Sequence, residues 1–210
     1  MSKTLIEIGI ATADFYCVAD VLRAIESSGA DGIHLDIMDG NFVGQITYGA
    51  KIVSDLRRHS SKRFDVHLMV ENPLPLIGQF KEAGADIIHI HAESKNVGAT
   101  LDHLREHGIE SGIAVRLETP LEKALPYLDY VSSVILMCAE TGYSGMEFNE
   151  VALARIAAVR AAYPGMRILV DGGMNFDTAK LALEAGADGI ISGSFLLAQK
   201  DLNAAIERMR

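Results

Sequence analysis

The stretch Gly32-Ile33-His34-Leu35-Asp36-Ile37-Met38-Asp39-Gly40 combines a buried strand with polar side chains at its end. Its apolar residues predict a β-strand that is covered on both faces. Residues i and i+2 of a strand share one face, so His34 and Asp36 are expected to point the same way. Because burying polar groups is costly, this pair indicates a functional site.

Two further strand-like runs repeat this pattern. The run Phe64–Val70 contains His67, and Met166–Val170 leads directly into Asp171. The candidate metal ligands are therefore His34, Asp36, His67 and Asp171. Imidazole nitrogen together with carboxylate oxygen suits one divalent ion, with Zn²⁺ as the first expectation and Fe²⁺, Mn²⁺ or Co²⁺ as alternatives.

Further side chains near the predicted strand ends are candidates for the surroundings of this metal. His89 and His91 share one face of a strand, and we expect them behind the metal ligands. Three methionines are expected as core filler or as an apolar wall for a substrate: Met38, Met69 and Met137. Arg116 is expected either to contact a substrate anion or, the interpretation we favour, to pair with Glu118 or Glu140.

The whole chain alternates short β-rich runs with amphipathic helical stretches. The predicted strands are Leu5–Ile10, Gly32–Ile37, Phe64–Val70, Asp86–His91, Gly112–Leu117, Ser133–Met137, Arg167–Asp171 and Gly189–Ser192. The predicted helices are Phe15–Ser28, Ala50–His59, Pro75–Ala83, Gly98–His107, Pro120–Tyr127, Asn149–Ala162, Asp177–Glu184 and Leu202–Met209. This alternation predicts an α/β protein with a (β/α)8 TIM barrel, and a doubly wound open sheet is the alternative. No linker-like segment interrupts residues 1–210, so we expect a single domain.

Composition and charge narrow the class of protein. A chain of 210 residues that is 49% hydrophobic can bury a sizeable core. The net charge of −9 argues against a nucleic-acid partner, and no apolar stretch approaches the ~20 residues that span a membrane. Cys17 and Cys138 are far apart and match no metal-binding spacing, which is typical of reduced thiols in a cytoplasmic protein without a secretion signal.

Glycine-bearing loops follow the last three predicted strands. Glycine lets backbone N–H groups approach an anion closely, and TIM barrels often bind phosphate with these loops. The candidate phosphate-binding residues are Gly142, Tyr143, Ser144, Gly145, Gly172, Gly173, Gly193 and Ser194. The chain has no Walker A motif and no glycine fingerprint of a dinucleotide-binding fold, so a phosphorylated small molecule is favoured over a nucleotide.

With these residues in place, the chain resembles the ribulose-phosphate 3-epimerase family from about Ile8 to its C-terminus. The matching segments are Ala13–Phe15, His34–Gly40, Asp65–Pro73, Val170–Gly173 and Ser192–Ser194. The resemblance implies a phosphate-binding barrel with one metal on the four candidate ligands. It also implies that Asp36 and Asp171 are the acid–base pair, that Gly173, Gly193 and Ser194 hold phosphate, and that the protein is a homo-oligomer.

The expected activity is epimerisation beside the ketone of a ketose phosphate, with D-ribulose 5-phosphate and D-xylulose 5-phosphate as the default pair. The chain departs from the family pattern at Ile8-Gly9, at Asn41 and Gly44, at Arg116-Leu117 and over Glu140–Met146. These departures lie in segments expected to face the substrate, so an epimerase of another ketose phosphate, such as a hexulose 6-phosphate, is an alternative. A non-catalytic phosphosugar-binding barrel is a second alternative. A related decarboxylase or synthase is disfavoured, because Asp65-Val66-His67 stands where those enzymes carry Asp-x-Lys.

Overall fold

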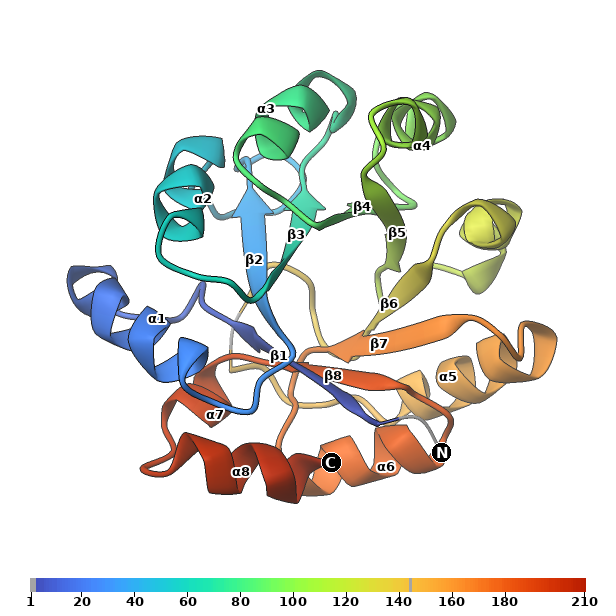
Figure 1. The fold of residues 1–210 in the computed structure, drawn as a ribbon. Coiled ribbons are helices and arrows are strands. Elements are labelled where there is room, and N and C mark those ends of the chain that lie inside the picture. The colour runs from blue at the N-terminus through green and yellow to red at the C-terminus, as the bar shows by residue number, and fades with distance from the viewer. Residues whose placement is uncertain (1–2, 144) are drawn as a thin grey trace.

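The computed structural model describes residues 3–143 and 145–210. Eight parallel strands follow one another around a closed barrel in chain order, and helices surround them (Figure 1). The strands are β1 (Leu5–Gly9), β2 (Gly32–Met38), β3 (Arg63–Met69), β4 (Ile87–His91), β5 (Glu110–Val115), β6 (Ser133–Met137), β7 (Arg167–Asp171) and β8 (Gly189–Ser192). Because β8 pairs with β1, the barrel prediction is confirmed and the open sheet is wrong.

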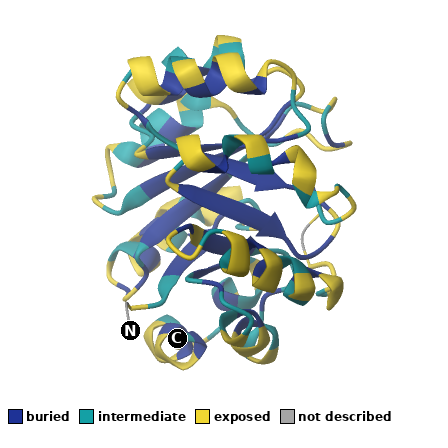
Figure 2. Cartoon of the chain, turned by 90° about the vertical axis from the view of Figure 1, so that its right-hand side faces the viewer, coloured by how far each residue is buried: buried dark blue, intermediate teal, exposed yellow. Residues whose placement is uncertain are grey.

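The α-helices lie on the outside of the barrel. They are α1 (Val18–Glu26), α2 (Ala50–Arg57), α3 (Ile77–Glu82), α4 (Val97–Glu106), α5 (Val151–Ala162), α6 (Phe176–Glu184), α7 (Ser194–Leu197) and α8 (Leu202–Met209). Short 3₁₀ helices are η1 (Phe15–Cys17), η2 (Leu74–Leu76), η3 (Leu121–Lys123) and η4 (Leu125–Tyr130). The strands are buried, while the helices expose their outer faces (Figure 2).

Two sets of strand residues point in opposite directions because side chains alternate along a strand. One set points outward into the main core against the helices, and it includes Ile8, Leu35 and Val66, all fully buried. The other set points into the barrel. This arrangement explains why the strands read as nearly continuous apolar runs in the sequence.

The interior of the barrel is divided by polarity. The side of β5 to β8 is filled by an apolar cluster that includes Ile135, Leu169 and Ile191. The side of β1 to β4 instead buries ionisable and polar groups, namely Glu7, His34, Asp65, His67, His89 and His91. Polar side chains in such a core need partners, and they define where the chemistry lies.

Gly112 on β5 makes room for this polar half. A Cβ atom at Gly112 would lie 2.0 Å from Cδ2 of His89, so only glycine allows the imidazole its place. His89 faces Gly112 in the register of β4 and β5.

Several predicted bounds differ from the structure. Strand β2 continues one residue further than predicted, to Met38, and β3 runs from Arg63 to Met69 instead of from Phe64 to Val70, so His34, Asp36 and His67 lie inside their strands. Strand β5 begins and ends two residues earlier than predicted. The helix predicted over Pro120–Tyr127 is found as η3 and η4, because Pro126 lacks the N–H group that a continuous α-helix needs there. Helix α7 was not predicted, since four residues are too few to show helical periodicity.

In the part of the chain that the structure describes, no helix has the length and apolar character needed to cross a membrane. Cys17 is exposed and Cys138 is buried, and neither forms a disulfide.

Candidate active site and metal centre

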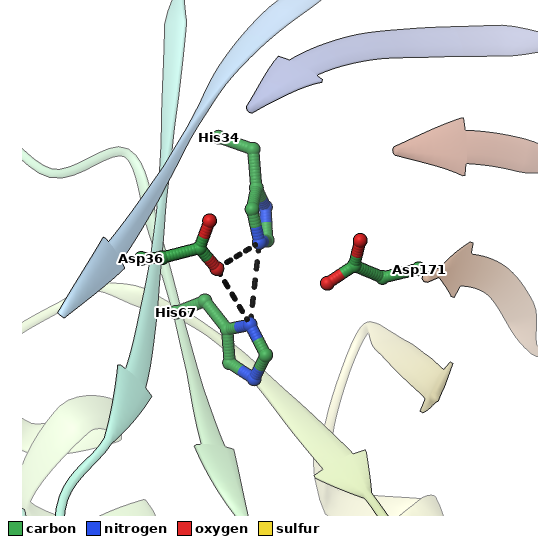
Figure 3. Close-up of side chains that lie close together, drawn as sticks. All are labelled: His34, Asp36, His67 and Asp171. Atoms are coloured by element: carbon green, nitrogen blue, oxygen red, sulfur yellow. Dashed lines mark hydrogen bonds and ion pairs between the residues drawn. The ribbon is translucent and has the colours of Figure 1, made fainter. Parts of the chain in front are cut away.

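Three strands bring the four candidate metal ligands together. His34 and Asp36 both belong to β2, and the register of β2 and β3 places Asp36 beside His67. Asp171 ends β7 on the other side of the barrel, and its carboxylate faces the other three side chains (Figure 3). Closure of the barrel therefore brings together residues that are far apart in the sequence. His34 and Asp171, the outermost two, are separated by 137 positions.

The ligand atoms of three residues form a compact triangle (Figure 3). Nε2 of His34 lies 3.2 Å from Oδ1 of Asp36 and 3.2 Å from Nδ1 of His67. Nδ1 of His67 lies 3.3 Å from the same Oδ1 atom. One ligand atom from each of the four residues, Asp171 included, lies within 4.8 Å of the others.

This spacing fits a divalent metal ion. A tetrahedral ion with bonds of about 2.0–2.1 Å holds its ligand atoms about 3.3–3.4 Å apart. The triangle of His34, Asp36 and His67 already has such edges, and Asp171 stands on the remaining side. The residues therefore fit the ion that the sequence predicts, and the donor set of two imidazoles and two carboxylates is one that Zn²⁺ and similar ions accept.

The second ring nitrogen of each histidine has a partner that fixes its proton. Nδ1 of His34 donates to Oδ2 of Asp65 at 3.2 Å, so Nε2 is the nitrogen directed toward the site. Nε2 of His67 lies 2.9 Å from Nε2 of His91, and Nδ1 of His91 donates to Glu93 at 3.0 Å. Such partners orient metal-binding imidazoles and raise their basicity. The prediction that His91 and His89 lie behind the ligands matches these contacts, since His89 donates to Asp65 at 2.6 Å.

The two aspartates of the site have opposite proton affinities. Burial alone would raise the pKa of Asp36, but the charge and hydrogen bonds of His34 and His67 hold it well below its usual range. Burial and then the charge of Asp36 raise the pKa of Asp171 to about 7. At neutral pH the pair therefore offers one ionised carboxylate and one carboxyl that retains a proton for part of the time.

A cavity of about 220 Å³ opens above the four residues at the carboxyl ends of the strands. Asp36 and Asp171 reach its surface, whereas His34 is completely buried beneath it. The three predicted wall residues, Met38, Met69 and Met137, all line the cavity.

Arg116 does not line this cavity in the described structure. Its guanidinium group lies over the ring of Phe42 at 4.0 Å and donates to the carbonyl oxygen of Phe42 at 2.5 Å. It also lies 3.8 Å from Glu118, one of the two partners that the sequence suggests. Arg116 thus supports the loop after β2, and Glu140, the other suggested partner, lines the cavity instead.

The predicted phosphate loops meet at one side of the cavity. Its lining includes Gly142, Tyr143, Gly145, Gly172, Gly173, Gly193 and Ser194. Ser144, which the sequence also suggests, lies outside the described residues.

Backbone geometry makes two of these glycines necessary. Gly173 has a φ of +69°, and a Cβ there would lie 2.4 Å from the backbone nitrogen of Phe148. A Cβ at Gly193 would lie 2.8 Å from the carbonyl oxygen of Gly9. Only glycine allows the loops after β7 and β8 to pack this closely around the cavity.

The two helices that follow these loops begin differently. The side chain of Asn175 accepts hydrogen bonds from the first N–H groups of α6, so that end is already capped. Within the described residues, α7 begins at Ser194, and its N-cap residue Gly193 provides no side-chain cap. Both residues line the cavity, and because the first N–H groups of a helix have no partner within it, they can donate to an anion.

Sequence reasoning missed several residues of this site. Thr12, Glu140 and Asn175 line the cavity, but isolated polar residues in predicted loops carry no pattern that singles them out. Asp65 and Glu7 were missed as well, although Asp65 shares a strand face with His67 by the i, i+2 rule.

The fold is that of a TIM-barrel enzyme, and its candidate active site lies at the carboxyl ends of the strands, where barrels of this architecture carry their chemistry. Residues 5–197 match the model of the ribulose-phosphate 3 epimerase family, and the chain belongs to that family. It is accordingly an isomerase of the epimerase class that acts on carbohydrates.

Individual relatives agree along nearly the whole chain. It is 37% identical over 207 residues to the ribulose-phosphate 3-epimerase of Bacillus subtilis, covering 96% of this chain and 95% of the relative. It is 32% identical over 204 residues to the cytoplasmic isoform of ribulose-phosphate 3-epimerase from Oryza sativa, covering 95% and 90%. Among solved structures, a 3-hexulose-6-phosphate synthase has a TM-score of 0.73 at 15% identity, covering 98% of this chain and 97% of that one, which shows the shared fold alone.

Proposed function

We propose that the protein inverts the carbon next to the ketone of a ketose phosphate, with D-ribulose 5-phosphate and D-xylulose 5-phosphate as the default pair. The observation that carries this proposal is the placement of Asp36 and Asp171. The two carboxyl groups reach one cavity from β2 and β7, beside two imidazoles, and their pKa values are displaced in opposite directions. Epimerisation needs one group to take a proton from carbon and another to return one to the opposite face.

The ionised carboxylate of Asp36 acts as the base in one direction. Its Oδ1 atom is directed toward His34 and His67, so the remaining oxygen, Oδ2, takes the proton from carbon. Asp171 holds a proton on its carboxyl group and delivers it from the other face. In the reverse reaction the two roles are exchanged, as microscopic reversibility requires.

A divalent ion would be held by the four candidate ligands, His34, Asp36, His67 and Asp171. Zn²⁺ is the first candidate, and Fe²⁺, Mn²⁺ and Co²⁺ are the alternatives. When bound, such an ion supplies Lewis-acid stabilisation of the negative charge that develops on substrate oxygen atoms. Asp65 and His91 keep the two imidazoles oriented for this task.

The glycine loops supply the binding energy that positions the sugar. The phosphate group is held by backbone N–H groups near Gly173, Gly193 and Ser194, on the side of the cavity next to Asp171. Gly142, Tyr143 and Gly145 close the cavity from the loop after β6. Because phosphate is remote from the reacting carbon, its binding orients the substrate without taking part in proton transfer.

Solvent deuterium incorporation tests this proposal. In D₂O the metal-loaded wild type should place deuterium at the epimerised carbon, and Asp36→Asn and Asp171→Asn should each lose both exchange and turnover. The control is Asp102→Asn, which removes an exposed carboxylate on α4 that pairs with Arg105. Unchanged exchange and turnover in both site variants would remove this mechanism.

Steady-state kinetics with a panel of ketose phosphates identify the substrate. The segment Glu140–Met146 departs from the family pattern and contributes Glu140, Tyr143 and Met146 to the cavity, so a hexulose 6-phosphate epimerase is the second candidate. If D-ribulose 5-phosphate and D-xylulose 5-phosphate are the natural pair, the highest kcat/KM is expected for D-ribulose 5-phosphate. If every ketose phosphate binds without turnover in the metal-loaded protein, the chain is a non-catalytic phosphosugar-binding barrel.

We also propose that the protein acts in the cytoplasm as a homo-oligomer. The cytoplasmic isoform among its relatives and the two unbridged cysteines support the location. Sedimentation analysis of the purified protein tests the assembly, and a monomer at all concentrations would contradict it.

A further inference from the structure

A second cavity lies at the end of the barrel opposite the active site. It has a volume of about 140 Å³, and its lining includes the first residues of several strands. The polar members of the lining are Glu7, Asp31, Arg63, Asp65, His89, Ser133 and Arg167. Its inner wall, formed by Glu7 and Asp65, lies directly behind His34.

Glu7 has no role in the proposed reaction, yet it is a buried acid. It is 5% exposed, and its Oε2 atom has no hydrogen-bond partner among the described residues. Burying a carboxylate oxygen without a hydrogen-bond partner costs free energy of folding. A ligand that contacts this oxygen would remove that cost. The oxygen is directed toward Nδ1 of His34, 3.8 Å away.

Asp65 adds a second buried carboxylate at the same place. Its Oδ2 atom lies 3.2 Å from Nδ1 of His34, and the residue is completely buried. The guanidinium group of Arg63, which also lines this cavity, pairs with Glu110 at 2.5 Å. The carboxyl groups of Glu7 and Asp65 therefore converge on one imidazole nitrogen, Nδ1 of His34.

From this geometry we infer a second metal site, in which Oε2 of Glu7, Oδ2 of Asp65 and Nδ1 of His34 bind a divalent transition-metal ion, with Zn²⁺ as the best match. One ligand atom from each residue lies within 4.8 Å of the others. The cavity beside them has room for water molecules that complete the coordination. A mixed set of imidazole nitrogen and carboxylate oxygens suits zinc better than calcium.

Binding at this second site has a defined proton balance. Nδ1 of His34 otherwise donates its proton to Asp65, so the incoming ion displaces that proton to solvent. His34 then uses Nε2 toward the active site and Nδ1 toward the second site. The charge of the ion offsets the two buried carboxylates, and the oxygen of Glu7 gains its missing partner.

Zinc stoichiometry tests the second site independently of catalysis. Metal-free protein is titrated with Zn²⁺ and the bound zinc per chain is measured after dialysis. All proteins carry His103→Ala, because His103 in α4 and His107 just after it are half-buried neighbours, with ring centroids 4.1 Å apart, that can bind zinc adventitiously. The background protein should bind two zinc ions per chain, and Glu7→Gln should bind one or hold the second at least about tenfold more weakly.

Glu110→Gln is the matched control. This variant makes the same chemical change at the same end of the barrel. Glu110 pairs with Arg63 and lies outside the proposed ligand set, so the variant should bind both ions. One zinc ion per chain in the background protein, or two equally tight ions in Glu7→Gln, overturns the proposal. If Glu7→Gln does not fold, anomalous diffraction of the unsubstituted protein at the zinc edge decides, because the second ion must appear between Glu7 and His34.

Discussion

The Nε2 atoms of His67 and His91 lie 2.9 Å apart, and the far nitrogen of His91 donates to Glu93. Burial lowers the pKa of His91 to about 4, despite the opposing effect of Glu93, so its imidazole is neutral at physiological pH. It then accepts the hydrogen bond from His67 Nε2–H and leaves Nδ1 of His67 available to the proposed metal ion. A buried histidine outside the candidate ligand set thus fixes which nitrogen of His67 is available.

We expect His91→Leu to weaken metal binding by about 10–100-fold, because His67 loses the acceptor that fixes its tautomer and orientation. Competition with a chelator in the metal-loaded protein measures this change. His59→Leu is the control, since His59 is exposed just after α2, away from the site. Equal affinities in wild type and His91→Leu would contradict the assigned role.

Gly173→Ala should damage phosphate binding. The substitution places a Cβ 2.4 Å from the backbone nitrogen of Phe148 and strains a residue with a φ of +69°. We expect the KM for the ketose phosphate to rise about tenfold or more, which corresponds to ~1.4 kcal/mol. Steady-state kinetics measure it, with Gly49→Ala as a control that meets no atom within 4 Å. An unchanged KM would show that this loop does not hold phosphate.

Gly112→Ala should destabilise the polar half of the barrel. The new Cβ would overlap His89 and force it away from Asp65 and from Ser133, whose Oγ lies 2.8 Å from its Nε2. Overpacking of this kind costs about 1–3 kcal/mol, measured as the free energy of unfolding in urea. Gly98→Ala in α4 meets no atom within 4 Å and should leave stability the same or higher. Equal destabilisation by both substitutions would refute this explanation.

The buried carboxyl of Asp171 should make the metal-free protein less stable as pH rises. Burial, followed by the charge of Asp36, raises its pKa from 3.8 to about 7, so the folded state binds more protons than the unfolded state between these values. Stability is therefore lost from about pH 4 to above pH 7. Asp171→Asn removes this loss, and its advantage over wild type should grow to on the order of 2 kcal/mol above pH 7.

Urea unfolding of metal-free wild type and Asp171→Asn at several pH values measures this difference. Asp102→Asn on the surface of α4 should show no pH-dependent gain. A constant difference between wild type and Asp171→Asn from pH 4 to pH 8 would contradict the raised pKa.

The barrel could be predicted because its strands are short, strongly apolar and separated by helical periods. The register of Asp36 beside His67 could not, since pairing depends on how strands tilt and close in three dimensions. The sequence indicated four candidate ligands that the structure brings together, but it described His34 as lying at a strand end. Because β2 continues four residues beyond His34, to Met38, the imidazole is buried beneath the cavity.

The group behind the metal centre escaped prediction for a different reason. Glu7 is surrounded in the sequence by Ile6 and Ile8, and a single acid in an apolar run has no periodic partner. Its neighbours in space, Asp65 and His34, come from other strands and become visible only when the barrel closes. Long-range polar contacts of this kind need coordinates, even where each strand is predicted correctly.

The binding of one divalent ion by His34, Asp36, His67 and Asp171 is the central claim, and anomalous diffraction from zinc-loaded crystals tests it most directly. The claim predicts a peak enclosed by these four side chains, with bonds of about 2.0–2.2 Å to one atom of each. A map without a peak at that position, from crystals loaded in turn with zinc, iron, manganese and cobalt, would contradict it.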